Sequence, residues 1–162
     1  MGKLAKPSAG TKAPAFDLPS DSGKNLKLGD YAGRSLVLYF YPKDNTPGCT
    51  REAQAFTKLL ASFKKAGADV VGVSKDSVAS HCNFRDKLKL KVPLASDPDL
   101  AVHKAYGAFG EKTMYGKKVT GVIRSTFLID VDGKGVGKIR RAWSNVKVDG
   151  HAEAVLDELK KR

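Results

Sequence analysis

The chain has little cysteine: its 162 residues include 2 cysteines and 3 histidines. Cys49 and Cys82 lie far apart, so the chain has no C-x-x-C dithiol of the thioredoxin type. Two cysteines are also too few for the disulfide framework of a small secreted domain. The cysteines and histidines are scattered, not grouped at the short spacings that hold structural zinc. We therefore expect neither a disulfide scaffold nor a metal site.

Long hydrophobic runs are also missing. The longest strongly apolar run is residues 36–41, far short of the ~20 residues that a membrane-spanning helix needs. The N-terminal segment MGKLAKPSAG has no apolar core of a secretory signal, and Lys6 stands where N-myristoylation requires Ser or Thr. These features predict a cytoplasmic protein that has no membrane partner.

Acidic residues are few relative to basic ones, with 17 Asp and Glu against 29 Lys and Arg, and the net charge is +12. Such an excess favours a nucleic-acid partner in principle. The basic residues are spread along the whole chain, however, and no zinc-finger, basic-helix or RNA-binding motif accompanies them. We interpret the charge as a solubilising surface and expect no specific nucleic-acid site.

The composition is otherwise that of an ordinary globular protein, with 41% hydrophobic and 28% charged residues. The length fits a single domain spanning residues 1–162, with about 1–10 as a flexible N-terminus. Apolar patterns and turn residues predict the following elements. They are a hairpin of strands 16–18 and 25–28, strands at 36–41, 70–74, 122–130 and 135–143, helices at 47–66, 77–88, 97–106 and 149–159, a short segment at 93–95 and a polar loop at 111–118. This order predicts an α/β fold with a central mixed sheet, helices on both of its faces and an N-terminal β-hairpin.

Cys49 lies in the most informative arrangement, a strand followed by a loop and a helix. Thr46 suits the N-cap position and Pro47 the first helical position, which places Cys49 in the first turn. There the unpaired backbone N–H groups and the helix dipole favour a thiolate, the reactive form of cysteine. Pro42 and Pro47 bracket and stiffen the loop. On spacing alone, Cys49 is either a prepared nucleophile or a small apolar residue.

The motif Pro42-x-x-x-Thr46-x-x-Cys49 is similar to the active-site motif of peroxiredoxins. The wider stretch LYFYPKDNTPGCTRE resembles the bacterioferritin comigratory protein subfamily, also called PrxQ. The resemblance covers nearly the whole chain, including APAFDLPSDSGK, SVASH, LASDPD, RSTFLI and WSNVKVDGH. It implies a thioredoxin-like fold and a thiol peroxidase that reduces hydrogen peroxide and organic hydroperoxides. It implies no metal, haem, flavin or nicotinamide cofactor.

The resemblance also implies a role for each matching residue. Cys49 is the peroxidatic cysteine, and Thr46 places its hydroxyl between the thiolate and the peroxide. Pro42 shields the site from water, and Arg124 holds the thiolate and polarises the peroxide. Glu52 orients neighbouring groups. The competing interpretations are an ordinary N-cap for Thr46, a surface or ion-paired arginine for Arg124 and a solvated helix face for Glu52.

The second cysteine departs from one family pattern. Many members of this subfamily carry the resolving cysteine five residues after the peroxidatic one, where this chain has Gln54. Cys82 lies on the helix that carries the resolving cysteine in another branch of the subfamily. At 100° per residue Cys82 shares a face with Arg85, whereas Phe84 and Leu88 are expected to face the core. We expect Cys82 to be an accessible thiol, and the alternative is an inert free cysteine.

The implied reaction cycle ends in an intramolecular disulfide between Cys49 and Cys82, which thioredoxin or a glutaredoxin-like protein reduces. One rival interpretation is a one-Cys peroxiredoxin whose Cys49 is resolved by an external thiol. A rival of another class is a basic nucleic-acid-binding or holdase protein on the same fold. We expect a monomer because no large apolar surface pattern stands out in the sequence.

Overall fold

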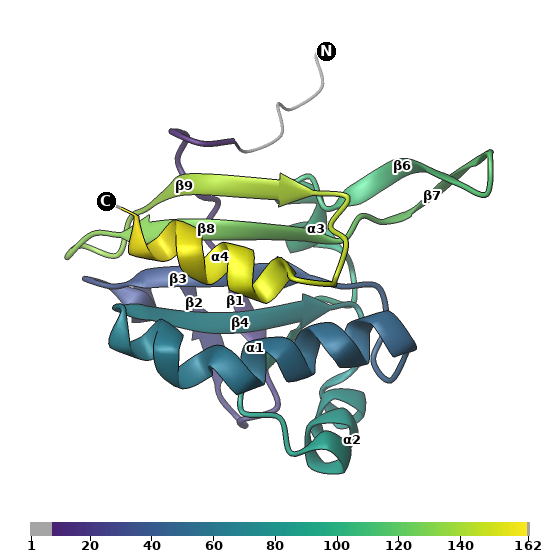
Figure 1. The fold of residues 1–162 in the computed structure, drawn as a ribbon, viewed down its shortest axis with the longest axis horizontal. Helices are drawn as coiled ribbons and strands as arrows, with labels where there is room; N and C mark the ends of the chain where they lie inside the picture. The colour runs from purple at the N-terminus through teal and green to yellow at the C-terminus, as the bar shows by residue number, and fades with distance from the viewer. Residues whose placement is uncertain (1–7, 162) are drawn as a thin grey trace.

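A five-stranded mixed sheet forms the centre of the protein, with the strand order β5-β4-β3-β8-β9 (Figure 1). The computed structural model describes residues 8–161, so most of the predicted flexible N-terminus lies outside the described residues. β3 runs parallel to β4 and antiparallel to β8, which confirms the predicted mixed sheet. The five strands are β3 (Ser35–Phe40), β4 (Ala68–Ser74), β5 (Leu94–Ser96), β8 (Ser125–Val131) and β9 (Gly137–Ser144).

The central strand β3 is buried on both of its faces, and its side chains alternate between two cores. Val37 and Tyr39 belong to the core beneath the helices α1 and α4, which lie side by side on one face of the sheet (Figure 1). Leu38 and Phe40 belong to the core on the opposite face. Because both faces of β3 are buried, apolar residues follow one another along it, and a continuous apolar run correctly predicts a central strand. The bounds of the two helices are α1 (Pro47–Lys65) and α4 (His151–Lys160).

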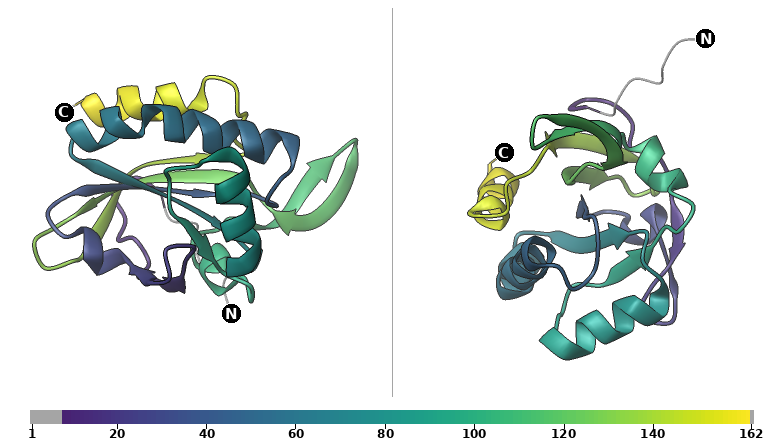
Figure 2. Two further views of the ribbon diagram at one scale, coloured as in Figure 1. Left: turned by 90° about the horizontal axis from the view of Figure 1, so that it is seen from below. Right: turned by 90° about the vertical axis from the view of Figure 1, so that its right-hand side faces the viewer.

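The opposite face is covered by the N-terminal hairpin and by short helices (Figure 2). The predicted hairpin is confirmed, because β1 and β2 pair antiparallel. A further helix, α2, packs against the edge strand β5 and buries Phe84 in the core that α1 also covers. The bounds of these elements are β1 (Asp17–Pro19), β2 (Asn25–Lys27), η1 (Leu28–Tyr31), α2 (Val78–Leu88) and α3 (Ala101–Ala105).

The prediction of a loop at residues 111–118 is wrong. β6 (Phe109–Met114) and β7 (Lys117–Val122) form an antiparallel hairpin that projects from the body of the protein (Figure 1). Tyr115 and Gly116, at its tip, both have positive φ angles, of 52° and 77°. The residues of β7 up to Thr120 are exposed, so no core face imposes the alternation of apolar and polar residues that marks a strand. A Tyr-Gly tip also lacks the Asn-Gly or Asp-Gly signature of such turns.

The strand predicted at residues 122–130 is interrupted. β7 ends at Val122 and β8 begins at Ser125. The backbone N–H of Ile123 donates to the carbonyl of Ala108 (2.7 Å), and the carbonyl of Arg124 accepts from the N–H of Val146 (3.0 Å). The backbone therefore changes partners at Arg124, which lies in the break and not inside a strand.

Two features that would indicate other classes of function are absent from the described part of the chain. Among the described residues, no helix combines the length and apolar character needed to cross a bilayer. In the same part of the chain, no group of three or more His, Cys, Asp or Glu side chains is arranged to hold a metal ion.

Candidate active site

Cys49 lies in the first turn of α1, as predicted, and its side chain is buried at 2% exposure. Thr46 takes the N-cap position with extended backbone angles, and Pro47 is the first helical residue. The predicted capping bond is absent, however: the Thr46 hydroxyl donates instead to the carbonyl of Lys43 (2.8 Å). The cap hydroxyl therefore pairs with none of the first-turn amides, and these donors remain available to an anion beside Cys49.

Arg124 approaches Cys49 from the break between β7 and β8. Its Nη2 donates to the Cys49 sulfur over 3.3 Å, and its Nη1 donates to Glu52 Oε1 over 2.5 Å. Burial lowers the pKa of Arg124, but the charges and hydrogen bonds of Glu52 and Cys49 outweigh it and raise the pKa overall. One guanidinium thus joins two side chains of α1 that lie one turn apart. The surface interpretation of Arg124 does not fit these contacts, whereas the ion-pair interpretation agrees with its pairing to Glu52.

Glu52 is buried beside this arginine, so the solvated-face interpretation of Glu52 is wrong. Its side chain is 1% exposed, and its Oε2 has no hydrogen-bond partner among the described residues. Burial raises the pKa of Glu52 to about 7, with the Arg124 charge and hydrogen bond opposing part of that rise. Glu52 therefore takes up a proton near neutral pH.

Glu52→Gln is expected to gain stability relative to wild type as the pH rises. An unfolded glutamate titrates near 4.5, so the stability from protonated Glu52 is fully present below pH 4.5 and is lost as the pH rises through about 7. Glutamine mimics the protonated form and does not titrate. The difference in the free energy of unfolding should grow by roughly 3 kcal/mol between pH 4.5 and 8. Urea denaturation at a series of pH values measures it.

The exposed Glu153 of α4 provides the control for this measurement. Glu153→Gln removes the same charge from the surface, and its stability difference from wild type should change little across the same pH range. A pH-independent difference for Glu52→Gln would show that Glu52 stays ionised in the folded protein.

His151, at the start of α4, experiences the same buried environment. Burial, with a further contribution from the charge of Arg124, lowers the pKa of His151 to about 4. The ring is therefore neutral at neutral pH, and its Nε2 lies 2.8 Å from the Thr126 hydroxyl. His151 adds no cation to the site, so Arg124 supplies the positive charge that faces Cys49.

The structure does not bring all the predicted site residues together. Pro42 lies two residues after the end of β3 and is half-buried at the start of the loop that ends at Thr46. Cys82 is half-buried on α2, and its sulfur lies 3.7 Å from the carbonyl oxygen of Asp21. Both cysteines are free thiols, and each is directed at a different partner. The predicted accessible position of Cys82 is thus only partly realised.

Gly48 is a site residue that the sequence did not reveal. A Cβ atom at this position would lie 3.3 Å from Nη2 of Arg124, the nitrogen that donates to Cys49. Glycine therefore leaves the room that Arg124 needs to approach the sulfur. The sequence does offer one indication of this role. A glycine lies inside the first turn of a helix, where it lowers the stability of the helix by about 1 kcal/mol relative to alanine.

Asp44 was also missed, although it lies in the same loop. The Asp44 carboxylate is buried and contacts His81 of α2, the residue that precedes Cys82. A buried pair of this kind joins residues far apart in sequence, so no local pattern reveals it.

Comparison with known proteins agrees with this geometry. The model of the AhpC/TSA family matches residues 9–136. A putative peroxiredoxin of Mycobacterium tuberculosis H37Rv is 49% identical over 159 residues, covering 98% of this chain and 99% of the relative. Peroxiredoxin Bcp of Escherichia coli K12 is 40% identical over 152 residues, covering 94% and 95%.

Solved structures agree as well. A structure of Xanthomonas campestris peroxiredoxin Q has a TM-score of 0.82 and 50% identity, and the match covers 90% of this chain and 89% of that one. A second, of the X. campestris bacterioferritin comigratory protein, is described as bearing on alkyl peroxide reduction, with a TM-score of 0.81, 49% identity and 90% coverage of each chain. The thioredoxin-like fold is thereby confirmed. The chain belongs to the peroxiredoxins, in the bacterioferritin comigratory protein or PrxQ group, and is an enzyme that reduces a peroxide at the expense of a thiol reductant.

Proposed function

We propose that Cys49 is the peroxidatic residue and that it reduces both hydrogen peroxide and organic hydroperoxides. The Cys49 thiolate attacks one oxygen of ROOH, an S–O bond forms and the O–O bond breaks. The sulfur loses two electrons and becomes a sulfenic acid, while the other oxygen takes a proton and leaves as ROH. The observation that carries this proposal is the 3.3 Å contact between Arg124 Nη2 and the Cys49 sulfur in the first turn of α1.

Arg124 and the first-turn amides act on the charge that moves during this step. Negative charge passes from the sulfur to the leaving oxygen, and fixed donors stabilise it without any reorganisation of water. Glu52 holds the guanidinium through Nη1, which leaves Nη2 directed at the sulfur. The Thr46 hydroxyl donates its hydrogen bond to the carbonyl of Lys43, so its oxygen can accept a hydrogen bond from the peroxide. Pro42 shields the start of the loop from water.

Cys82 is proposed to resolve the sulfenic acid. Its thiol attacks the sulfur of Cys49, a disulfide forms and water leaves with the hydroxyl oxygen of the sulfenic acid. A disulfide requires Cα atoms roughly 4.4–6.8 Å apart, whereas in the reduced fold the two sulfurs contact Arg124 and Asp21 respectively. We therefore propose that the first turn of α1 unwinds and that α2 shifts during this step.

Thioredoxin is the proposed reductant of the Cys49–Cys82 disulfide. Its dithiol exchanges with the disulfide, restores both thiols and becomes oxidised itself. The similarity to a protein described in terms of alkyl peroxide reduction supports organic hydroperoxides as substrates beside hydrogen peroxide.

The mass and free-thiol count of the protein after one equivalent of hydrogen peroxide test this cycle. Wild type should lose both thiols and two hydrogen atoms. Cys82→Ser should instead gain one oxygen on Cys49, because its sulfenic acid has no internal partner. Turnover with thioredoxin should fall to a few per cent or less in Cys82→Ser, while the first oxidation of Cys49 keeps its rate.

Cys49→Ser provides the control, because it keeps Cys82 as the single thiol and should react with peroxide only as slowly as an ordinary exposed thiol. Oxygen addition to Cys49 without disulfide formation in wild type would contradict the role of Cys82 and make this a one-Cys enzyme. Absence of any fast reaction would contradict the role of Cys49.

A further inference from the structure

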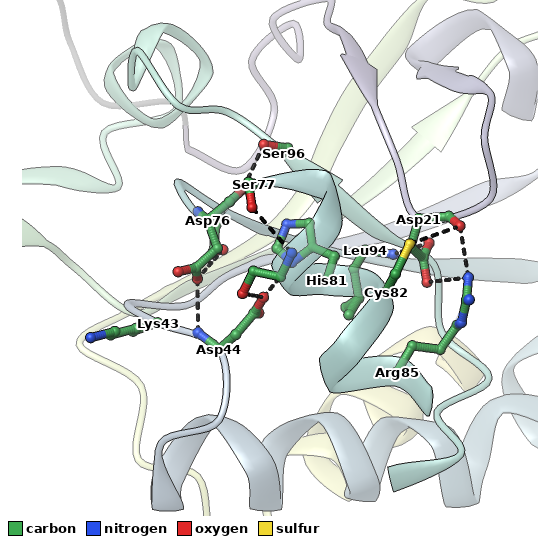
Figure 3. A network of polar contacts seen from close by, with 12 residues as sticks. Asp21, Lys43, Asp44, Asp76, Ser77, His81, Cys82, Arg85, Leu94 and Ser96 are labelled. Atoms are coloured by element: carbon green, nitrogen blue, oxygen red, sulfur yellow. Dashed lines mark hydrogen bonds and ion pairs between the residues drawn. The ribbon is translucent and has the colours of Figure 1, made fainter. Parts of the chain in front are cut away.

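Asp44 forms a buried hub between the active-site loop and α2 (Figure 3). Its carboxylate accepts hydrogen bonds from the hydroxyls of Tyr41 (2.6 Å) and Ser80 (2.8 Å) and lies 2.7 Å from His81 Nδ1. Burial raises the pKa of Asp44, but the hydrogen bonds from His81, Tyr41 and Ser80 outweigh this and hold the pKa below its usual value. The hub therefore carries a negative charge.

His81 of α2 is the partner of this carboxylate. Its Nδ1 faces the Asp44 carboxylate, and its Nε2 lies 2.9 Å from the carbonyl oxygen of Ala95 in β5. Both ring nitrogens therefore have a polar partner. His81 is fully buried, and a polar ring buried in this way is costly without its hydrogen-bond partners. We call this pair, together with Ser80, the Asp44–His81 latch.

Polar contacts continue on both sides of the latch. The backbone N–H of Asp44 donates to the Asp76 carboxylate (2.8 Å), and Lys87 of α2 donates to the side chain of Asn45 (3.0 Å). A cleft of about 460 Å³ is lined by residues of both the loop and α2, with Asp44, Ser80 and Lys87 among them. Discrete polar contacts therefore join the loop to α2 beside a cleft.

Cys82 is the residue after His81 and turns away from the latch toward Asp21 (Figure 3). Arg85, one turn later, donates to the same Asp21 carbonyl over 2.7 Å. Because Cys82 and His81 belong to one helix, Cys82 can move toward Cys49 only if this part of α2 moves. That movement must separate His81 and Ser80 from Asp44.

We propose that Asp44 and His81 are positioning residues that hold α2 against the active-site loop in the reduced enzyme, and so limit the rate at which Cys82 reaches the oxidised Cys49. This proposal rests on the proposed function of the two cysteines. The step it controls is the condensation of the Cys49 sulfenic acid with the Cys82 thiol, in which an S–S bond forms, the S–O bond breaks and water leaves. The latch takes no part in the bond changes.

Weakening the latch should accelerate disulfide formation, because it destabilises the closed position of α2 more than the open one. Losing one hydrogen bond to a charged group changes the equilibrium between the closed and open positions of α2 by about tenfold or more. We therefore expect Asp44→Asn to raise the rate constant of disulfide formation about tenfold or more. The same variant should accumulate less sulfinic acid at excess peroxide, since the sulfenic acid persists for a shorter time.

Ser80→Ala is a milder variant that keeps the contact between Asp44 and His81. It removes one hydroxyl from Asp44, and the rate constant should rise severalfold; Ser80→Thr retains a hydroxyl and should restore the wild-type rate. Alanine is a better helix former than serine, so a change in helix propensity alone would slow the opening of α2. The direction of the effect therefore separates the latch from a simple change in helix stability.

Asp97 and His103 provide a matched control pair. They are buried like the latch, with His103 Nδ1 2.6 Å from Asp97 Oδ2, but they join α3 to the end of β5 and not the loop to α2. Asp97→Asn should lower the global stability to a similar extent. It should leave the rate constant of disulfide formation within about twofold of wild type.

Rapid-quench mass spectrometry with one equivalent of hydrogen peroxide follows Cys49 oxidation and disulfide formation separately. Faster disulfide formation in Asp44→Asn and Ser80→Ala, but not in Asp97→Asn or Ser80→Thr, supports the latch. Equal rates in Asp44→Asn and wild type, or equal acceleration in Asp97→Asn, overturn it. If wild type forms no Cys49–Cys82 disulfide, the proposed function fails first, and that result is distinct from either outcome.

Discussion

Arg124→Leu should lower the second-order rate constant for oxidation of Cys49 by hydrogen peroxide about 100- to 1,000-fold. The substitution removes the Nη2 donor that lies 3.3 Å from the Cys49 sulfur. It also removes the cation that opposes the negative charge moving from the sulfur to the leaving oxygen. The rate is measured in a Cys82→Ser background by rapid-quench mass spectrometry, so that oxygen addition to Cys49 is observed without disulfide formation.

Two controls separate this effect from structural damage. Arg140 of β9 is also a partly buried arginine paired with a carboxylate, Asp130. Arg140→Leu should change the rate by no more than about twofold. The double variant Arg124→Leu/Glu52→Gln removes the carboxylate that Arg124→Leu leaves buried and unpaired, and its rate should remain low. Recovery of the rate in the double variant would mean that the unpaired Glu52, and not the missing donor, causes the loss.

Phe56→Ala should lower the free energy of unfolding by about 3–5 kcal/mol. Phe56 is fully buried, stacks on Tyr39 with ring centroids 4.7 Å apart, and meets His151 edge-on at 6.1 Å. It lies on the same face of α1 as Cys49 and Glu52, and it anchors that face on the central strand. Its removal leaves a cavity between the sheet and the two helices that cover it. Urea denaturation measures the loss.

Phe56→Leu is the matched variant, because it retains an apolar side chain and should cost only about 1 kcal/mol. A loss below 1 kcal/mol for Phe56→Ala would contradict the assignment of Phe56 to the core beneath α1. In that case the position of Cys49 would have to depend on the loop and the latch more than on the packing of the helix.

The local elements around Cys49 could be predicted from the sequence. A continuous apolar run predicts a strand covered on both faces, and β3 is indeed such a strand. The Thr46-Pro47 pair predicts the start of a helix with Cys49 in its first turn, and α1 begins there. These predictions succeed because the chemistry of neighbouring residues determines hydrogen bonding and capping within a few residues. The resemblance to a known family supplied the roles of Glu52 and Arg124, which local chemistry leaves open.

Predictions failed where a segment has no core to face or depends on a distant partner. The β6–β7 hairpin is polar because its strands project into solvent, so it carries little of the apolar periodicity from which strands are read. The predicted N-cap position of Thr46 is confirmed, but its hydroxyl donates to Lys43 within the loop and not to a helix amide. Both outcomes depend on the path of the chain through space and not on the propensity of the segment.

Local patterns of residues are enough to predict a mixed α/β fold and a cysteine at the start of a helix. The contacts of Arg124 with both Cys49 and Glu52, and of Asp44 with His81, arise from the tertiary structure alone. Each of these contacts joins residues separated by tens of positions. They form because the order of strands in the sheet brings the β7–β8 break and α2 to the loop after β3, and local periodicity carries no record of that order.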